Sequence, residues 1–409
     1  IILILLSKFL YWIGKLFGKD ADFSGRIALK IDEAILRKIK FPNNMIVVSG
    51  SNGKTSTVTM IHKVLTNAGF SVGCNLDTSN QMEGIVSMIL KSANLNGIVS
   101  KDVLLIECDE KNLATLLQYI KPRYLVITNL LRKQFMKYGH PEYIYECIRE
   151  VLTQDIQLIL NADDPISALL GYQRDKVIYF GMNQTSLSKH ENTSQYNDGA
   201  YCPNCNAIMQ YDYYHFHHIG SYHCDNCGFS RKTPQYAITN LDLKKGKMTM
   251  NKKHHITVPI NHVTQAYNLV ATYAVAKVFG VDESHIVKIL TNQPLENNDI
   301  QSIKINGQNM TFLLSKKENP ISYECAFQYV IDHKEECTVV LVSDTVNKTE
   351  ESDTSWIWDT NFELLNVDFV KKIILVGNEA NDFAIRFQNT TIEKNKIVVN
   401  VNRNETKNL

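Results

Sequence analysis

The residues from 50 to 56, Gly-Ser-Asn-Gly-Lys-Thr-Ser, have the composition of a phosphate-binding loop. Apolar, β-prone residues 45–48 precede the loop, and a helical pattern follows it as far as Leu65. Glycines let backbone N–H groups approach phosphates, and a helix N-terminus adds positive potential. Lys54 would reach the β- and γ-phosphates of a nucleotide, and the Thr55 hydroxyl would bind Mg²⁺. The residues that we expect at the phosphates are Gly50, Asn52, Gly53, Lys54, Thr55 and Ser56. Because two residues rather than four separate the glycines, a chance glycine turn is the alternative.

Acidic residues follow a second apolar run. Residues 103–106 predict a buried strand, which leads directly into Glu107-Cys108-Asp109-Glu110. Carboxylates at the carboxyl end of a strand are well placed to bind Mg²⁺ beside a phosphate loop. We assign Glu107 to magnesium and to catalysis because it comes first after the strand, with a solvated acidic turn as the alternative.

Four of the nine cysteines form two Cys-x-x-Cys pairs. Cys202 and Cys205 are followed, after 18 residues, by Cys224 and Cys227. This spacing is typical of a zinc ribbon, in which four thiolates complete the tetrahedron and leave no position open for catalysis. We therefore expect a structural zinc site in a reduced, cytosolic protein; a redox-active pair is the alternative.

Further apolar runs indicate the elements that position these residues. Strands are expected at 124–128, 157–160, 337–342 and 373–377, separated by helical patterns. Alternation of strand and helix predicts an α/β fold with a parallel, doubly wound sheet. A helix is expected at 265–274, where Asn268 could hydrogen-bond a base edge or cap the helix.

Length and charge limit the class of protein. A chain of 409 residues predicts two or three domains. We expect a helical lead-in at 1–40, an ATPase domain at 41–293 and a smaller α/β domain at 294–409. The ribbon would be inserted into the ATPase domain at about 199–233. The apolar and charged fractions exclude a disordered, collagenous or polytopic membrane protein. With 43 basic and 42 acidic residues, the chain lacks the basic field that nucleic-acid binding usually needs.

The N-terminal residues 1–17 form an apolar run that Lys8 and Lys15 interrupt. The run is too short to span a bilayer comfortably, and no signal-peptide cleavage site follows it. We expect a packed helix. Two alternatives are a helix that touches a membrane surface through Phe9, Trp12 and Phe17, and a true anchor.

These motifs, in this order, resemble the Mur ligase family of ATP-dependent amide-bond ligases. The family's G-[ST]-N-G-K-[ST]-[ST] loop stands at 50–56, and residues 353–359, Asp-Thr-Ser-Trp-Ile-Trp-Asp, are similar to a C-terminal signature. Together with the four-cysteine insert, the signature is similar to the ligase-like subunits of lipid II isoglutaminyl synthase within this family. The resemblance covers nearly the whole chain.

The resemblance implies a chemistry. ATP would phosphorylate the α-carboxylate of D-glutamate in the lipid II stem peptide, and ammonia from a separate GatD-type glutaminase subunit would then form D-isoglutamine. Asp353 would complete that subunit's Cys–His pair and act as a catalytic residue, and Asp359 is the next candidate. For either aspartate, the alternative is a purely structural role as a helix cap. Asn268 and Asn129 would contact adenine. The cofactors would be ATP, Mg²⁺ and structural Zn²⁺, and the protein would be cytoplasmic, at the inner face of the plasma membrane, with no nucleic-acid partner.

The sequence departs from the family in several places, among them 317–323 and 349–351, where glycines of the family pattern are missing. Lys133 and Met136 stand where the family has acids, and residues 294–300 replace a stretch that contains an arginine. Cations of this kind stabilise charge during phosphoryl transfer. We therefore keep two hypotheses: a working amidating ligase, or an altered relative that binds nucleotide and a glutaminase without phosphorylating muropeptide. An ordinary amino-acid-adding Mur ligase is a third, disfavoured by the four-cysteine insert and the signature.

Overall fold

The chain forms two compact units in a computed structural model. One unit comprises Ile1–Leu131, Pro141–Asn192 and Asp198–Leu295, and the other comprises Arg132–His140, Thr193–Asn197 and Glu296–Leu409. Two short segments of the middle of the chain therefore belong to the C-terminal unit. The structure describes residues 2–17, 21–133, 138–258, 260, 262–292, 300–305, 307–316, 318–343 and 353–400.

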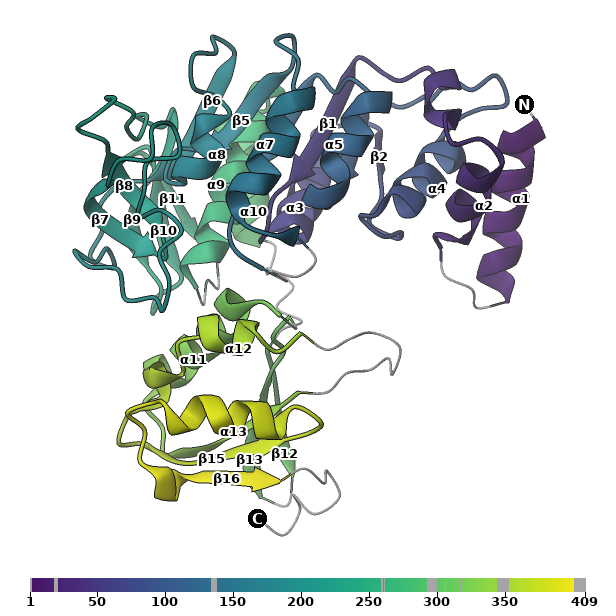
Figure 1. Cartoon of the computed structure of the whole chain (residues 1–409). Coiled ribbons are helices and arrows are strands. Elements are labelled where there is room, and N and C mark those ends of the chain that lie inside the picture. Colours follow the sequence, from purple (N-terminus) through teal and green to yellow (C-terminus); the bar gives the residue numbers. More distant parts are fainter. Residues whose placement is uncertain are drawn as a thin grey trace. The chain divides into compact units, whose positions relative to one another are not determined.

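The first unit is built on a large mixed sheet (Figure 1). Within the described ranges, nine strands are ordered β11-β10-β9-β6-β5-β4-β1-β3-β2. Adjacent strands from β2 to β9 pair in parallel, which confirms the expected α/β class. The strands are β1 (Asn44–Ser49), β2 (Val72–Cys74), β3 (Val103–Glu107), β4 (Tyr124–Ile127), β5 (Gln157–Asn161), β6 (Val177–Met182), β9 (Tyr236–Asp242), β10 (Lys247–Met250) and β11 (His254–Thr257).

One edge of this sheet differs from a purely parallel arrangement. The strands β9, β10 and β11 pair antiparallel. Only residues 243–246 and 251–253 connect them, whereas a parallel crossover needs a dozen residues or more. The short connections therefore impose hairpins at this edge.

Helices between the strands cover the sheet. The long helix α9 packs against β5, β6 and β9, and it also contacts α3, which begins directly after the phosphate loop. The helix α5 packs on α7, and α7 packs on α8. The helices of this group are α3 (Lys54–Asn67), α4 (Met82–Ser92), α5 (Glu110–Tyr119), α7 (Pro141–Val151), α8 (Pro165–Leu169), α9 (Val263–Val278) and α10 (Glu283–Asn292).

Two smaller parts complete the first unit. The cysteine-containing segment, inserted between β6 and β9, forms the antiparallel hairpin β7 (Gln210–Phe216) and β8 (Ile219–His223). The lead-in consists of α1 (Ile2–Leu16), α2 (Phe23–Ile31) and the 3-10 helix η1 (Ile35–Lys38), and α1 packs on α2 and α4. Of the helices that the structure describes, none combines the length and the apolar character needed to cross a membrane.

The second unit is a smaller α/β structure. Its described strands form a parallel sheet ordered β14-β15-β16 and a separate antiparallel hairpin, β12–β13. Its elements are β12 (Ile300–Ile305), β13 (Gln308–Leu313), α11 (Pro320–His333), β14 (Cys337–Val342), α12 (Trp356–Asp359), η2 (Phe362–Leu365), β15 (Val370–Val376), α13 (Ala380–Gln388), η3 (Lys394–Lys396) and β16 (Ile397–Asn400).

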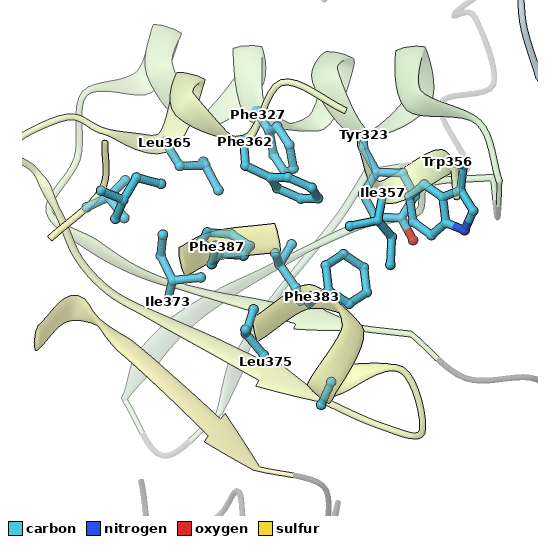
Figure 2. Packing of buried hydrophobic residues seen from close by; sticks show 14 residues of the cluster. Tyr323, Phe327, Trp356, Ile357, Phe362, Leu365, Ile373, Leu375, Phe383 and Phe387 are labelled. Atoms are coloured by element: carbon cyan, nitrogen blue, oxygen red, sulfur yellow. The ribbon is translucent and has the colours of Figure 1, made fainter. Parts of the chain in front are cut away.

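Aromatic side chains fill the core of the second unit (Figure 2). The ring of Phe362 lies 4.8 Å from that of Phe387 and 5.7 Å from that of Phe383, centroid to centroid. Trp356 packs edge-on against Phe383 at 5.8 Å. Side chains of this size contribute most of the burial energy in a small unit.

Side-chain contacts explain why two short segments of the middle of the chain join the second unit. The guanidinium of Arg132 forms a 3.2 Å ion pair with Asp359 and lies 4.6 Å from the ring centre of Tyr196. The side-chain amide of Asn361 donates a 2.8 Å hydrogen bond to the carbonyl of Thr193.

Truncating the centre of this core should destabilise the second unit. Phe383 is fully buried, and Phe383→Ala should lower the free energy of unfolding by about 3–5 kcal/mol, since it leaves a cavity. Phe312→Ala, at a ring that is 45% exposed, is the control and should cost much less. Urea denaturation measures both, and equal losses would contradict the packing described.

Candidate functional site

The phosphate loop, residues 50–53, follows a backbone path that requires its two glycines. Gly50 and Gly53 have φ values of +130° and +82°, which L side chains rarely adopt. A Cβ atom on Gly50 would lie 2.3 Å from the Thr128 hydroxyl, and one on Gly53 would lie 2.0 Å from Oδ1 of Asn268. Both glycines are therefore needed for conformation and for close approach.

Residues after β4 hold the loop in place. The Asn129 side chain accepts a 3.0 Å bond from the Asn52 N–H and donates a 3.1 Å bond to the Asn52 carbonyl. The Thr128 hydroxyl donates to the same carbonyl at 2.7 Å, and the Ser51 N–H donates to the Asn129 carbonyl at 2.9 Å. Asn129 thus shapes the loop, a role that the sequence did not suggest, and its adenine contact stays a prediction.

Lys54 is the first residue of α3, and its ammonium is buried beside acids. It forms a 3.0 Å ion pair with Glu110 and donates to the Gly50 carbonyl. Burial lowers the pKa of Lys54, but the negative charges of Glu110, Asp109 and Glu107 outweigh it, so the pKa lies above its ordinary value. Glu110 compensates the buried cation. Sequence reasoning missed Glu110, although it is the last acid in the run that begins at Glu107.

Thr55 and Glu107 are brought together as the sequence predicts for a magnesium site. The Thr55 hydroxyl donates to Oε1 of Glu107 at 2.9 Å. Adjacent oxygens around an octahedral Mg²⁺ are also about 2.9 Å apart, given bonds of 2.0–2.1 Å. Hydroxyl and carboxylate oxygens are ligands that Mg²⁺ prefers, so these two residues fit as neighbouring ligands.

Two asparagines position Glu107. The side-chain amide of Asn80 donates to Oε1 of Glu107 at 2.8 Å. Asn75 accepts from the Glu107 N–H at 2.7 Å and donates to its carbonyl at 2.9 Å. These partners lie between β2 and α4; the sequence marks both through the family resemblance, but their spacing does not predict the contact with Glu107.

The helix α9 brings Asn268 to the phosphate loop. Its side chain is buried against Gly53. The cap of α9 is His262, whose side chain accepts from the Thr264 N–H, so Asn268 does not cap the helix. Its contact with a base edge stays a prediction. Ser56 and Thr55 are exposed at the N-terminus of α3, where backbone N–H groups favour anions.

The four predicted cysteines converge. The sulfur atoms of Cys202, Cys205, Cys224 and Cys227 lie within 4.8 Å of one another. The side-chain amide of Asn226 donates to Cys205 Sγ at 3.4 Å and lowers the pKa of that thiol to about 6. A closed set of four thiolates fits tetrahedral Zn²⁺ and leaves no open position. The cysteines would therefore hold the metal as a structural centre.

Two buried aspartates after β5 contact the insert that carries β7 and β8, and one of them also contacts the segment beside the phosphate loop. Asp164 accepts from the Leu130 N–H at 2.7 Å, next to Asn129, and lies 3.3 Å from the His218 imidazole between β7 and β8. Burial lowers the pKa of His218, but the close contact with the negatively charged Asp164 raises it above its ordinary value. Asp163 likewise binds Arg231 at 2.6 Å. Sequence reasoning gave these aspartates no role.

Asp353 lies in the second unit, at the start of the C-terminal signature. Its Oδ1 accepts a 2.9 Å bond from the Ser355 N–H, just before α12. Trp356 and Ile357 of the signature are buried in the core shown in Figure 2. Asp359 is engaged in the ion pair with Arg132. Core packing of the residues that follow fixes the turn that holds Asp353, and its role toward a partner stays a prediction.

Comparison with known families supports the interpretation of both units. Residues 48–276, more than half of the chain, match the Mur ligase middle domain. The chain belongs to the Mur ligase family. Residues 314–408 of this Mur ligase match a second model, the MurT ligase C-terminal domain, which includes the Asp353 signature.

Similar curated proteins carry the name MurT. This Mur ligase is 30% identical over 391 residues to the lipid II isoglutaminyl synthase (glutamine-hydrolyzing) subunit MurT of Staphylococcus aureus (strain COL), covering 95% of the chain and 87% of that protein. It is 27% identical over 410 residues to the subunit of the same name from Streptococcus pneumoniae, covering 96% and 86%. The resemblance stated from the motifs is thereby confirmed.

Solved structures agree on the fold. The pseudomurein peptide ligase type C from Methanothermus fervidus matches with a TM-score of 0.67 at 20% identity, over 90% of this Mur ligase and 70% of that chain. MurF from Acinetobacter baumannii matches with a TM-score of 0.62 at 15% identity, over 91% and 71%. At this identity the likeness concerns the fold alone.

Removing one predicted zinc ligand should release the metal. We expect the purified chain to contain about one zinc ion and Cys205→Ser to lose most of it, because three thiolates leave the tetrahedron open. Cys147→Ser, at a cysteine of α7 outside the cluster, is the control. Metal content is measured by mass spectrometry, and full zinc occupancy in Cys205→Ser would contradict the assignment.

Proposed function

We propose that this Mur ligase is the ATP-dependent subunit that amidates the α-carboxylate of D-glutamate in the lipid II stem peptide, giving D-isoglutamine. The observation that carries the ligase assignment is the contact of Thr55 with Glu107, 2.9 Å apart, beside the cation of Lys54. The substrate assignment draws on the two MurT relatives, whose similarity extends over 95% of the chain or more.

The reaction would proceed in two steps. A carboxylate oxygen attacks the γ-phosphorus of ATP, ADP leaves, and an acyl phosphate forms. Ammonia then attacks the carbonyl carbon, the bond to the phosphate oxygen breaks, inorganic phosphate leaves, and the nitrogen loses a proton. Lys54 and the N–H groups at the start of α3 would stabilise phosphate charge, while Thr55 and Glu107 would hold Mg²⁺, which supplies Lewis-acid neutralisation when bound.

A separate GatD-type glutaminase subunit would supply the ammonia. Within the described residues, Oδ2 of Asp353 is buried and finds no hydrogen-bond partner, while Oδ1 is engaged by the Ser355 N–H. A carboxylate held in this way suits a partner's imidazole, because an aspartate that orients a histidine supports a Cys–His pair. Since lipid II is a membrane lipid and ATP is cytoplasmic, the complex would work at the inner face of the plasma membrane.

The second hypothesis is an altered relative that binds nucleotide and a glutaminase without ligating, and it rests on the departures from the family pattern. Lys133, where the family has an acid, places its ammonium 4.6 Å from the ring centre of Tyr138, and its neighbour Arg132 is paired with Asp359. Met136 and residues 294–299, where the other departures occur, lie outside the described residues. Turnover of ATP separates the two hypotheses.

Lys54 provides the test of the ligase assignment. With a glutaminase partner, glutamine and lipid II supplied, the chain should hydrolyse ATP, and Lys54→Met should reduce turnover at least about 100-fold, because the phosphates lose a buried cation. Lys63→Met, on the same helix and away from the loop, is the control and should retain activity. Nucleotide binding without turnover by the unmodified chain would favour the altered relative.

Asp353→Asn tests the shared glutaminase site. The amide keeps an oxygen for the Ser355 N–H but cannot stabilise a partner's imidazolium, so glutamine hydrolysis by the complex should fall by about 10²–10⁴-fold. ATP binding should persist, since the variant lies in the other unit. Glutamate release and nucleotide affinity are measured side by side, with exposed Asp368→Asn as the control. Unchanged glutamine hydrolysis would refute the role of Asp353.

A further inference from the structure

Helix α1 presents an apolar face to solvent. Ile2, Leu5, Phe9 and Trp12 are all exposed, and Phe9 and Trp12 are 58% and 63% exposed. Their spacing of three, four and three residues places them along one side of the helix. Helices at the surface of a soluble protein usually have the opposite arrangement, with apolar residues inside and polar residues outside.

Polar contacts hold α1 in this orientation. Its inner face, which packs on α2 and α4, carries the buried residues Ile4, Ser7 and Gly14. The Lys8 ammonium donates to the Lys91 carbonyl at 3.1 Å, and the Tyr11 hydroxyl donates to Asp77 at 2.8 Å. Rotating the apolar face inward would break both contacts.

Positive charge is concentrated in the same part of the chain. Residues 1–40 contain eight Lys or Arg and four Asp or Glu, a net charge of +4, whereas the whole chain carries +1. Arg26 and Lys30 are exposed on α2, which packs against α1. The lead-in therefore combines an apolar face with a net positive charge, while the rest of the chain is slightly acidic.

We propose that α1 lies in the plane of an anionic lipid surface, with Ile2, Leu5, Phe9 and Trp12 inserted between the head groups and the acyl chains. An in-plane helix buries such a face by about 5–10 Å, and acidic head groups attract the surrounding cations. A second copy on the same face would instead bring two positive lead-ins together. The inference deepens the proposed function, because it places the first unit where a lipid-linked substrate lies. It rests on the proposed function only for the reason why the chain would bind a membrane.

The test is co-sedimentation of the full chain with vesicles that contain no lipid II. The unmodified chain should bind phosphatidylglycerol–phosphatidylcholine vesicles, and binding should weaken in high salt and on phosphatidylcholine alone. The double variant Phe9→Glu/Trp12→Glu should lower the partition at least about tenfold, since two large apolar side chains are lost from the face. Because neither glutamine, ATP nor lipid II is present, an inactive ligase would not affect this result.

The control is Tyr143→Glu, at an exposed aromatic residue of α7, which should bind vesicles as the unmodified chain does. Matching melting temperatures would show that the variants are folded. Three outcomes would overturn the inference: no binding to anionic vesicles, binding that the double variant retains, or a dimer in solution that the double variant converts to a monomer while vesicle binding is absent.

Discussion

The backbone of the phosphate loop is the constraint on which the first unit depends. Gly50 and Gly53 take conformations that only glycine adopts readily, and both are in contact with neighbours that leave no room for a Cβ atom. The loop therefore requires β4 beside β1, so that Thr128 and Asn129 can bind it, and α9 behind it, so that Asn268 can pack on Gly53. The loop conformation thus depends on which strands and helices lie next to β1.

Buried charges around the loop occur in compensated pairs. Lys54 is paired with Glu110, Arg231 with Asp163, and His218 with Asp164. Such pairs add little net stability, because desolvation offsets much of the Coulomb attraction, but breaking one leaves an uncompensated buried charge. Their effect is to specify position. Both pairs tie the insert that carries β7 and β8 to the end of β5, and Asp164 also binds the Leu130 N–H beside Asn129.

The second unit is organised around its aromatic core and the turn that holds Asp353. Its aromatic core fixes Trp356 and Ile357, and the turn before α12 then holds Asp353 through the Ser355 N–H. The ion pair of Arg132 with Asp359 ties a segment from the middle of the chain to the same signature. Separate family models, the Mur ligase middle domain and the MurT C-terminal domain, match residues 48–276 and 314–408.

Local chemistry made much of this protein predictable. The runs around 45–48 and 103–106 indicated strands because apolar β-prone residues mark buried strands, and the structure has β1 and β3 there. The convergence of the four cysteines could be expected because both halves of a zinc ribbon carry the same short motif. Glu107 beside Thr55 followed from the rule that strand ends meet at one edge of a parallel sheet.

Only the tertiary structure decided the contacts that refine the site. Glu110 rather than Asp109 pairs with Lys54, the Asn129 amide binds the loop, and Asp164 binds the Leu130 N–H. The first two contacts join residues that are 56 and 77 positions apart in the sequence. The outward apolar face of α1 likewise depends on its packing against α2 and α4. The amino-acid sequence by itself determined the strand, loop, helix and cysteine motifs, because each is set by neighbours along the chain. The partners across the fold were decided by packing, because a periodic pattern does not encode which distant side chain will face which.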